Sequence, residues 1–378
     1  MKETNLFKAF FESEKAGGFI LIFATFISLL LANSIFQLEY LQIWNYEIGK
    51  HSFTEWINDG LMTLFFLLIG LELEREVYIG ELSTLKKAAL PLIGALGGMI
   101  IPALIYAAFN YGTITQSGVG IPMATDIAFA IGILSLLGNR VPTSLKIFLT
   151  ALAVIDDLGA IIVIAIFYTS SISFLNLGIA LGILVFLFIL NRLKVNHLIP
   201  YLIGGILMWY FMLNSGVHAT ITGVLLAFVI PFGDGGKKNI SYKLQHILHQ
   251  PVALIILPLF ALANTGIVLN SNWYESLNHS NSIGIILGLI IGKPLGIWLF
   301  SYLGVLVGIG VLPKDLKWSS LFGAAILGGI GFTMSLFISL LAFDNNEDII
   351  ISKIAILIAS TIAAITGFIY LKFKLKKD

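Results

Sequence analysis

Four ionisable residues lie deep inside apolar stretches of this sequence: Asp126, Asp156, Asp157 and Lys293. A charged side chain at the centre of a membrane costs at least ~2.5–3.5 kcal/mol, so such residues are expected to face a polar cavity or to pair with each other. A purely structural Asp–Lys ion pair is the alternative, and Lys293 fits it best. Three acids and one base at one depth predict an ion pathway or a substrate site.

The neighbouring carboxylates Asp156 and Asp157 indicate a specific chemistry. Consecutive helical residues point about 100° apart, so one acid can face Lys293 while the other faces a cavity. A carboxylate without a cation partner in a low-dielectric environment can hold a proton near neutral pH. Its hard oxygens also suit a small hard cation. A group that takes either a proton or sodium, but not both, is the minimum device for exchange.

Two of the apolar stretches contain helix-breaking residues. Pro122 removes a backbone donor, and Thr125 with Asp126 then opens a new half-helix, where an acid is favoured by the helix dipole. The Gly-rich segment 328–333 repeats this pattern without the acid, and Lys293 on the neighbouring span can offset carbonyl ends there. A Gly-rich packing face is the alternative explanation for both segments, and it is stronger for the second.

The rest of the chain predicts an all-α membrane protein. It is 58% hydrophobic, 11% charged and free of cysteine, which excludes a thiol nucleophile, a thiolate metal site and a disulfide framework. A net charge of +1 gives no reason to expect nucleic-acid binding. Apolar runs long enough to span a bilayer predict twelve transmembrane helices at 17–36, 58–78, 89–110, 117–138, 147–168, 175–191, 199–214, 217–232, 251–269, 283–304, 321–343 and 349–371.

Basic residues predict the orientation of these spans. With both termini cytoplasmic, only Lys50 and Lys353 of the 22 Lys and Arg fall outside and Lys293 falls mid-span, as the positive-inside rule requires. No segment is long enough for a soluble domain, so 1–378 is expected to be a single membrane domain. Segment 1–16 is predicted to be a cytoplasmic amphipathic helix, and 37–57 an external hairpin or an irregular loop.

The triplets of spans at 89–168 and 283–371 each contain a broken middle helix. The first triplet begins inside and the second begins outside, so the two are predicted to be inverted repeats. Interrupted spans at matching positions in two halves point to the substrate site of a secondary transporter.

Several collinear motifs make the chain similar to a known family. They cover nearly the whole chain and are specific as a set, at 58–62, 65–72, 122–130, 153–161, 216–220, 257–261, 292–296 and 329–335. On these motifs the sequence resembles the NhaA sodium–proton antiporters. The resemblance implies two broken helices that cross near the membrane midplane, a homodimer joined through the external hairpin, and the bacterial inner membrane as location.

The resemblance also implies roles for individual residues. Asp157 matches the principal ligand for sodium and protons, and Asp156 its neighbour, paired with Lys293. Asp126 with Thr125 matches the group that compensates the crossed half-helices. The cytoplasmic funnel and the pH response are implied for Glu72, Arg75, Glu76, His218, His246 and His249.

The residues of the implied funnel and pH response also have simpler structural explanations. Glu72, Arg75 and Glu76 can equally be a solvated helix end, and His218 an interfacial histidine with its hydrogen bonds satisfied. The sequence also departs from the family at Gln245, where well-studied members carry Glu. Because Gln245 cannot titrate, a pH sensor in segment 233–250 is expected to lack one charge and to give a less steep activation.

The expected function is therefore electrogenic exchange of sodium, or lithium, for protons, in sodium and pH homeostasis, with no cofactor and no enzymatic activity. An intramembrane aspartyl protease would need two acids on different spans, which Asp126 with Asp156 or Asp157 superficially provides. No Gly-x-Gly-Asp string accompanies them. A cation channel is a third possibility, although broken inverted repeats favour alternating access.

Overall fold

The computed structural model describes residues 2–80, 82–168 and 172–375, which are almost entirely helical. Met1 and residues 376–378 of the expected cytoplasmic ends lie outside this description. Within the described part, nine helical stretches are long and apolar enough to cross a membrane, or up to ten when one bent pair counts as a single span. The chain is therefore an all-α, multi-span membrane protein.

The N-terminal region forms one long helix and a small cap. Helix α1 runs without interruption over Lys2–Ala32, so the stretch 2–16 continues directly into the first apolar span. Helix α2 (Gln37–Asn45) follows, and then strands β1 (Glu47–Ile48) and β2 (His51–Ser52) pair antiparallel. Segment 37–57 thus contains a helix and a short hairpin.

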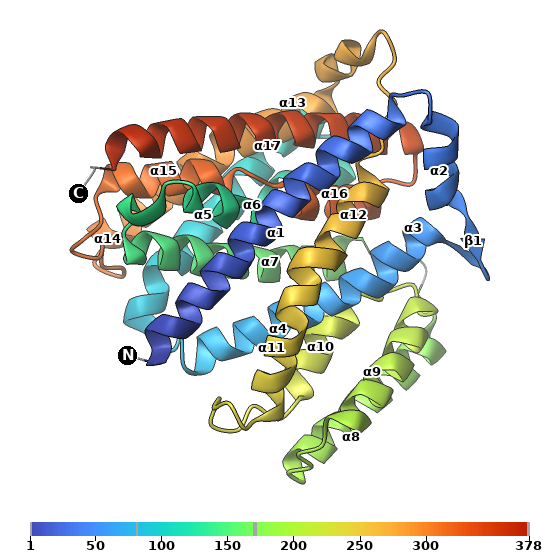
Figure 1. Cartoon of the computed structure of the whole chain (residues 1–378), viewed down its shortest axis with the longest axis vertical. Coiled ribbons are helices and arrows are strands. Elements are labelled where there is room, and N and C mark those ends of the chain that lie inside the picture. The colour runs from blue at the N-terminus through green and yellow to red at the C-terminus, as the bar shows by residue number, and fades with distance from the viewer. Residues whose placement is uncertain (1, 81, 169–171, 376–378) are drawn as a thin grey trace.

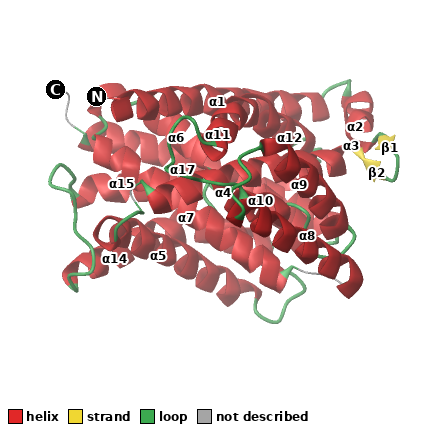
Figure 2. Cartoon of the chain, turned by 90° about the horizontal axis from the view of Figure 1, so that it is seen from below, coloured by secondary structure: helices red, strands yellow, loops and turns green. Residues whose placement is uncertain are grey.

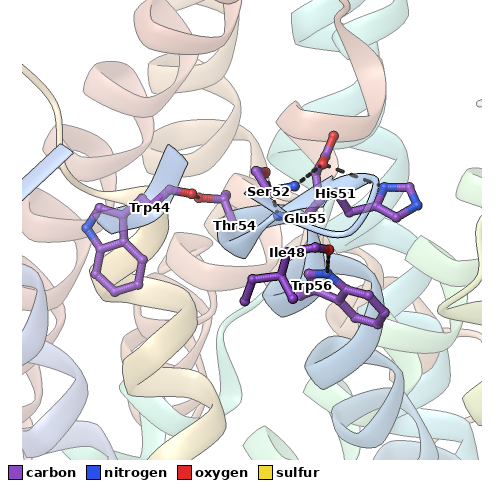
Figure 3. Close-up of polar contacts among 7 residues, drawn as sticks. All are labelled: Trp44, Ile48, His51, Ser52, Thr54, Glu55 and Trp56. Atoms are coloured by element: carbon purple, nitrogen blue, oxygen red, sulfur yellow. Dashed lines mark hydrogen bonds and ion pairs between the residues drawn. The ribbon is translucent and has the colours of Figure 1, made fainter. Parts of the chain in front are cut away.

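Polar contacts fasten this hairpin to the start of the next helix, α3 (Phe53–Glu55), as Figure 3 shows. Ser52 and Glu55 form a reciprocal capping box, in which the Ser52 hydroxyl accepts from the Glu55 backbone and the Glu55 carboxylate accepts from the Ser52 backbone. The Trp56 indole donates to the Ile48 carbonyl at 3.0 Å. Because a capping box satisfies two backbone donors, it ties the end of the hairpin to the first turn of α3.

In the described part of the chain, three spans contain a short π-helical turn. Trp56–Leu61 (η1) leads into α4 (Met62–Tyr78), and Val252–Ile256 (η4) joins α11 (Ile240–Pro251) to α12 (Leu257–Asn264). Gly288–Gly292 (η6) joins α13 (Ser280–Leu287) to α14 (Lys293–Leu306). Such turns are frequent at functional sites, and η6 directly precedes Lys293.

The expected inside segment 233–250 is not a loop throughout. Helix α11 begins at Ile240 and joins the following span, so the membrane helix starts earlier than the predicted 251. The prediction rested on apolar runs, and 240–250 is too polar to belong to one. Here Pro251 lies inside the helix, and the π-helical turn η4 follows it.

The first triplet consists of α5 (Leu85–Asn110), an interrupted span and α7 (Thr143–Phe167). The interrupted span combines a 3₁₀ helix, Gln116–Met123 (η2), with α6 (Ile127–Ser135), and the short turn Gly138–Arg140 (η3) leads on to α7. In the second triplet, the corresponding elements are α13–α14, the pair α15 (Trp318–Gly328) and α16 (Phe332–Ala342), and α17 (Asn346–Lys374).

Between the triplets lie α8 (Phe174–Arg192), α9 (Leu198–Leu213) and α10 (Ile221–Val229). Figure 1 shows α8 and α9 side by side at one edge of the molecule. Helices α9 and α10 occupy the predicted spans 199–214 and 217–232, but nine residues of α10 reach only ~14 Å, about half the hydrocarbon thickness. The count of twelve therefore exceeds the spans that qualify by length.

The first helices of the two triplets pack backbone to backbone. A Cβ on Gly97 of α5 would lie 2.2 Å from the Gly296 carbonyl oxygen of α14, and the reverse distance is 2.1 Å. Only glycine permits this approach. Both chain ends lie at one end of the bundle and the hairpin lies at the other, as Figures 1 and 2 show.

Candidate functional site

Two helix breaks form the centre of the candidate site. In the first triplet, η2 ends at Met123, Ala124 is extended, and Asp126 occupies the N-cap of α6. In the second triplet, α15 and α16 meet at an angle of 44° around Gly329–Gly331. Pro122 explains the first break, and the absence of side chains at Gly328, Gly329 and Gly331 explains the second.

The two breaks are in direct contact. The Asp126 backbone N–H donates to the Ile330 carbonyl at 2.7 Å. The Thr125 hydroxyl lies 2.9 Å from the Gly328 carbonyl. The two interrupted spans thus touch at their breaks, where backbone groups freed by one break are satisfied at the other.

Asp126 caps two helices with one carboxylate. Its Oδ1 accepts from the Phe129 N–H of its own helix at 2.9 Å. Its Oδ2 accepts from the Thr333 N–H at 3.0 Å and from the Thr333 hydroxyl at 2.5 Å, both at the start of α16. Both N-termini carry the positive end of a helix dipole, so a buried carboxylate is stabilised between them.

Lys293 forms the complementary cation. Its ammonium group is fully buried, lies 3.0 Å from Asp156 Oδ2, and donates to the Met123 carbonyl at the end of η2. It therefore offsets a carbonyl of the first broken span, rather than one of the second as the sequence suggested. The Thr125 hydroxyl donates to the same Asp156 oxygen at 2.8 Å.

Asp157 has no such cation. Its side chain is buried, and its Oδ1 has no hydrogen-bond partner. The other oxygen of Asp156, Oδ1, also lacks a partner. Buried polar atoms are normally satisfied, and an exception calls for an explanation such as an absent water or ion. Two adjacent carboxylates therefore offer unsatisfied oxygens at the break.

Two of the predicted funnel residues on α4, Glu72 and Arg75, contact α11. Glu72 Oε1 lies 3.6 Å from His249 Nδ1. The Arg75 guanidinium lies 5.0 Å above the Tyr242 ring, which stacks on the His246 ring. These residues form one contact between two helices rather than a freely solvated helix end.

His218 lies elsewhere. It precedes α10 in the chain and contacts Tyr168 at the C-terminal end of α7. Its Nε2 lies 2.8 Å from the Tyr168 carbonyl, and burial lowers the pKa of His218 while this hydrogen bond opposes the change. The Tyr168 hydroxyl in turn bonds the Ser117 carbonyl and the Gly120 N–H of η2. The predicted pH-response residues are thus divided between two places.

Some contributors to the site were missed from the sequence. Thr333 stood in the Gly-rich string but was not counted as a site residue, although a Thr after each break was a usable signal. Ser360 of α17 accepts from the Phe332 N–H at 3.1 Å, and no motif pointed to it. No group of three or more His, Asp or Glu suited to a resident metal occurs among the described residues.

Comparison with known proteins identifies the family. A family model described as Na+/H+ antiporter 1 matches residues 8–371. An Na(+)/H(+) antiporter NhaA 1 of Flavobacterium johnsoniae is 69% identical over 99% of this chain and 98% of that protein. An Na(+)/H(+) antiporter NhaA of Flavobacterium psychrophilum is 65% identical over 100% and 98%.

A solved structure supports the fold independently. The sodium proton antiporter of Methanocaldococcus jannaschii superposes with a TM-score of 0.56 over 99% of both chains at 15% identity. The family is one of transporters, so the aspartyl protease alternative is wrong and the chain is not an enzyme. Because the match covers nearly the entire sequence, the chain belongs to the NhaA family of Na+/H+ antiporters.

Proposed function

We propose that this protein exchanges Na+, or Li+, for protons across the bacterial inner membrane, and that Asp157 with Asp156 binds the exchanged ions. One observation carries the proposal: Asp157 is buried beside Asp156 with an unsatisfied oxygen, whereas Asp126 and Lys293 are committed to bonds around the helix breaks. A buried carboxylate without a partner can take a proton or a cation, and the two compete for it.

Competition between protons and sodium for Asp157 is enough to couple the movement of one to that of the other. When Asp157 holds a proton, the carboxyl is neutral and a cation has no charge to bind. When sodium binds, the carboxylate oxygens and nearby hydroxyl or carbonyl oxygens replace part of its hydration shell. Thr125, whose hydroxyl touches both Asp156 and the second break, is the nearest candidate for such an oxygen.

We further expect electrogenic exchange. If Asp156 also takes a proton, its ion pair with Lys293 breaks, and two protons replace one monovalent cation. One net charge then moves in each cycle. A membrane potential alone should drive transport, and insensitivity to a potassium–valinomycin potential would contradict this stoichiometry.

Alternating access suits the arrangement of the two triplets. Their matching order of helices, their contacting breaks and the Gly97–Gly296 approach of their first helices are what an inverted repeat of two three-span units leads one to expect. A hollow of about 20 Å³, lined in part by Glu72, Ile127 and His249, lies between α4, α6 and η4, where we place the inner end of the cytoplasmic funnel.

The distribution of basic residues favours cytoplasmic termini, with the hairpin outside. The hairpin is hydrogen-bonded to the start of the next helix, and Tyr46 and Ile48 beside it are exposed, which suits the homodimer that we propose for it. In this arrangement, Glu72 and His249 face the cytoplasm.

The direct test uses everted vesicles with an acidified interior. Adding sodium should raise the interior pH, followed by the fluorescence of a trapped dye, and lithium should act similarly. A cation channel, the second candidate, would instead give a sodium current with no coupled proton flux. Absence of any sodium-driven pH change in vesicles that contain the folded protein would refute the proposal.

A further inference from the structure

Five aromatic side chains from three helices form a cluster at the end of the bundle where both chain ends lie. They are Trp298 and Tyr302 of α14, Trp318 and Phe322 of α15, and Tyr370 of α17, and we call them the aromatic surface. Figure 1 shows α14 and α15 at the same end as the C-terminus. Neither the exchange mechanism nor the sequence motifs assign this surface a role.

The five rings contact one another across helix boundaries. Trp298 stacks on Tyr302 with ring centroids 5.6 Å apart and meets Trp318 edge to face at 6.4 Å. Phe322 lies 6.2 Å from Trp298 and 5.7 Å from Tyr370, again edge to face. Stacked and edge-to-face pairs at such distances stabilise each other, so the rings hold one another in place.

The aromatic surface lies on the outside of the helix bundle. Tyr302 is 40% exposed, and the other four rings are half-buried. Exposed apolar side chains continue the surface along both flanking helices: Leu299, Leu303 and Leu306 on α14, and Ile369 and Phe373 on α17. In a membrane-spanning chain such apolar faces contact lipid, and Trp and Tyr gather at the level of the lipid headgroups.

Three of the rings carry a hydrogen-bond donor that the protein does not use. Within the described residues, the indole N–H groups of Trp298 and Trp318 and the hydroxyl of Tyr302 donate to no protein acceptor. Buried Trp and Tyr usually find such a partner, whereas those at a membrane interface turn their polar ends to the wet side. The surface therefore combines apolar faces with three donors suited to phosphate or ester oxygens.

Two lysines on α17 approach the aromatic surface. The Lys374 ammonium lies 5.9 Å from the centre of the Tyr370 ring, and the Lys372 ammonium lies 5.8 Å from the centre of the Phe368 ring. Both lysines are exposed. A cation over a ring is attracted by the ring face and keeps its charge and its donors, so these two ammonium groups are held beside the rings.

The connection between α14 and α15 adds two more cations. Lys317 directly precedes Trp318, and Lys314 lies in the same connection, with both side chains exposed. The acid between them, Asp315, accepts a hydrogen bond from the Ser144 hydroxyl of α7. Neither α14 nor α15 contains an acid, and the acids of α17 lie in its first turn, at the far end of that helix. The region around the rings is therefore positively charged.

We propose that the aromatic surface and these four lysines bind the headgroup of an anionic phospholipid. The ammonium groups attract the phosphate, the three ring donors bind phosphate or ester oxygens, and the acyl chains lie along the exposed apolar faces of α14 and α17. Charge complementarity selects an anionic lipid, because a zwitterionic headgroup would bring its own cation toward the lysines.

The proposed lipid site is separate from the exchange site and from the hairpin. In Figure 1, α17 lies at the opposite edge of the molecule from α8 and α9, and the hairpin lies at the opposite end of the bundle from α14 and α15. Helix α15 is also one half of the second broken span, and its last carbonyl, that of Gly328, lies 2.9 Å from the Thr125 hydroxyl. A lipid held against α15 should therefore stabilise the folded chain.

Thermal unfolding in a neutral detergent tests the site without any transport. The melting temperature is measured with added phosphatidylglycerol, phosphatidylcholine or inorganic phosphate. A ligand that binds only the folded chain raises the melting temperature, so phosphatidylglycerol should raise that of the unmodified chain by several degrees more than phosphatidylcholine does. Because this difference between the two lipids is taken within one variant, it cancels any change in the variant's own stability.

Matched double substitutions locate the effect. Lys317→Gln combined with Lys374→Gln should remove most of the difference, whereas Lys317→Arg combined with Lys374→Arg should keep it. Lys237→Gln combined with Lys238→Gln removes the same charge from an exposed turn before α11 and should leave the difference unchanged. Tyr302→Phe, which lacks only the hydroxyl, should reduce it in part.

Native mass spectrometry gives a second measurement. The unmodified chain and the control with both substitutions before α11 should retain more phosphatidylglycerol per chain than the variant with Lys317→Gln and Lys374→Gln. Equal responses in the two glutamine variants, or a response to phosphatidylcholine as large as that to phosphatidylglycerol, would overturn the site. Stabilisation by inorganic phosphate that matches phosphatidylglycerol would overturn the assignment to a lipid. None of these measurements depends on sodium exchange, so a failure of the proposed function would leave the lipid site standing.

Discussion

The two triplets share an architecture but not a chemistry. In each, a middle helix is broken and the third helix touches the break: Asp156 of α7 binds Thr125 at the first, and Ser360 of α17 binds the Phe332 N–H at the second. The first triplet thus carries every acid of the site, while the second supplies neutral hydroxyls and Lys293. A repeated scaffold can hold two crossing breaks, but the ion chemistry needs charge on only one copy.

The largest expected effect on transport comes from removing the charge of Asp157 on α7, the third helix of the first triplet. Asp157→Asn should reduce sodium-driven proton flux to background while folding remains near normal, because Asn keeps the size but neither binds a proton reversibly nor carries a full charge. Ser360→Ala, the matched change in the second triplet, should retain most of the flux. Both are measured by dye fluorescence in everted vesicles, and flux retained in Asp157→Asn would disprove the assignment.

Lys293 should matter for stability as well as function. Lys293→Ala leaves the buried Asp156 carboxylate unpaired, and removal of one partner of a buried ion pair costs about 3–5 kcal/mol. Lys293→Arg keeps the charge and should lose less of both stability and flux. Melting temperatures in detergent provide the measurement, and equal values for all three proteins would argue against the pairing.

Loss of the cap that Asp126 provides to two helices should have an intermediate effect on stability. Asp126→Asn replaces charge-assisted bonds at two helix N-termini, and loss of a cap costs roughly 0.5–2 kcal/mol at each. Thr333→Val, which removes only the neutral partner of the second triplet, should cost less. Thermal unfolding measures the loss of stability in each variant. A larger loss for Thr333→Val than for Asp126→Asn would show that the Asp126 carboxylate is not the main stabilising group at the two breaks.

Substitution of His218 should have the smallest effect on stability, and only at acid pH. Burial lowers its pKa in the folded state, so below the unfolded value of ~6.5 the unfolded chain binds more protons and stability falls as pH decreases. Above that pH the group contributes no such loss. His218→Gln should therefore show a shallower decline of the melting temperature between about pH 6.5 and pH 5. Parallel declines in the two proteins would mean that His218 does not titrate in this range.

Most of the fold followed from local sequence, and part of the site did as well. Apolar runs placed the spans, and both breaks were visible as Gly and Pro near Thr–Asp or Thr. The lengths of α9 and α10, and the early start of α11 across Pro251, did not follow, because helix ends depend on packing and capping as much as on hydropathy.

The sequence by itself determined which residues must be buried in the bilayer and which of them carry charge, because hydropathy and residue type are properties of short segments. Only the tertiary structure decided which partner each charge meets. Asp126 binds Thr333 from 207 residues away, and Lys293 meets Met123 across 170. Such contacts depend on the rotation of each helix about its axis and on where the chain brings distant breaks together.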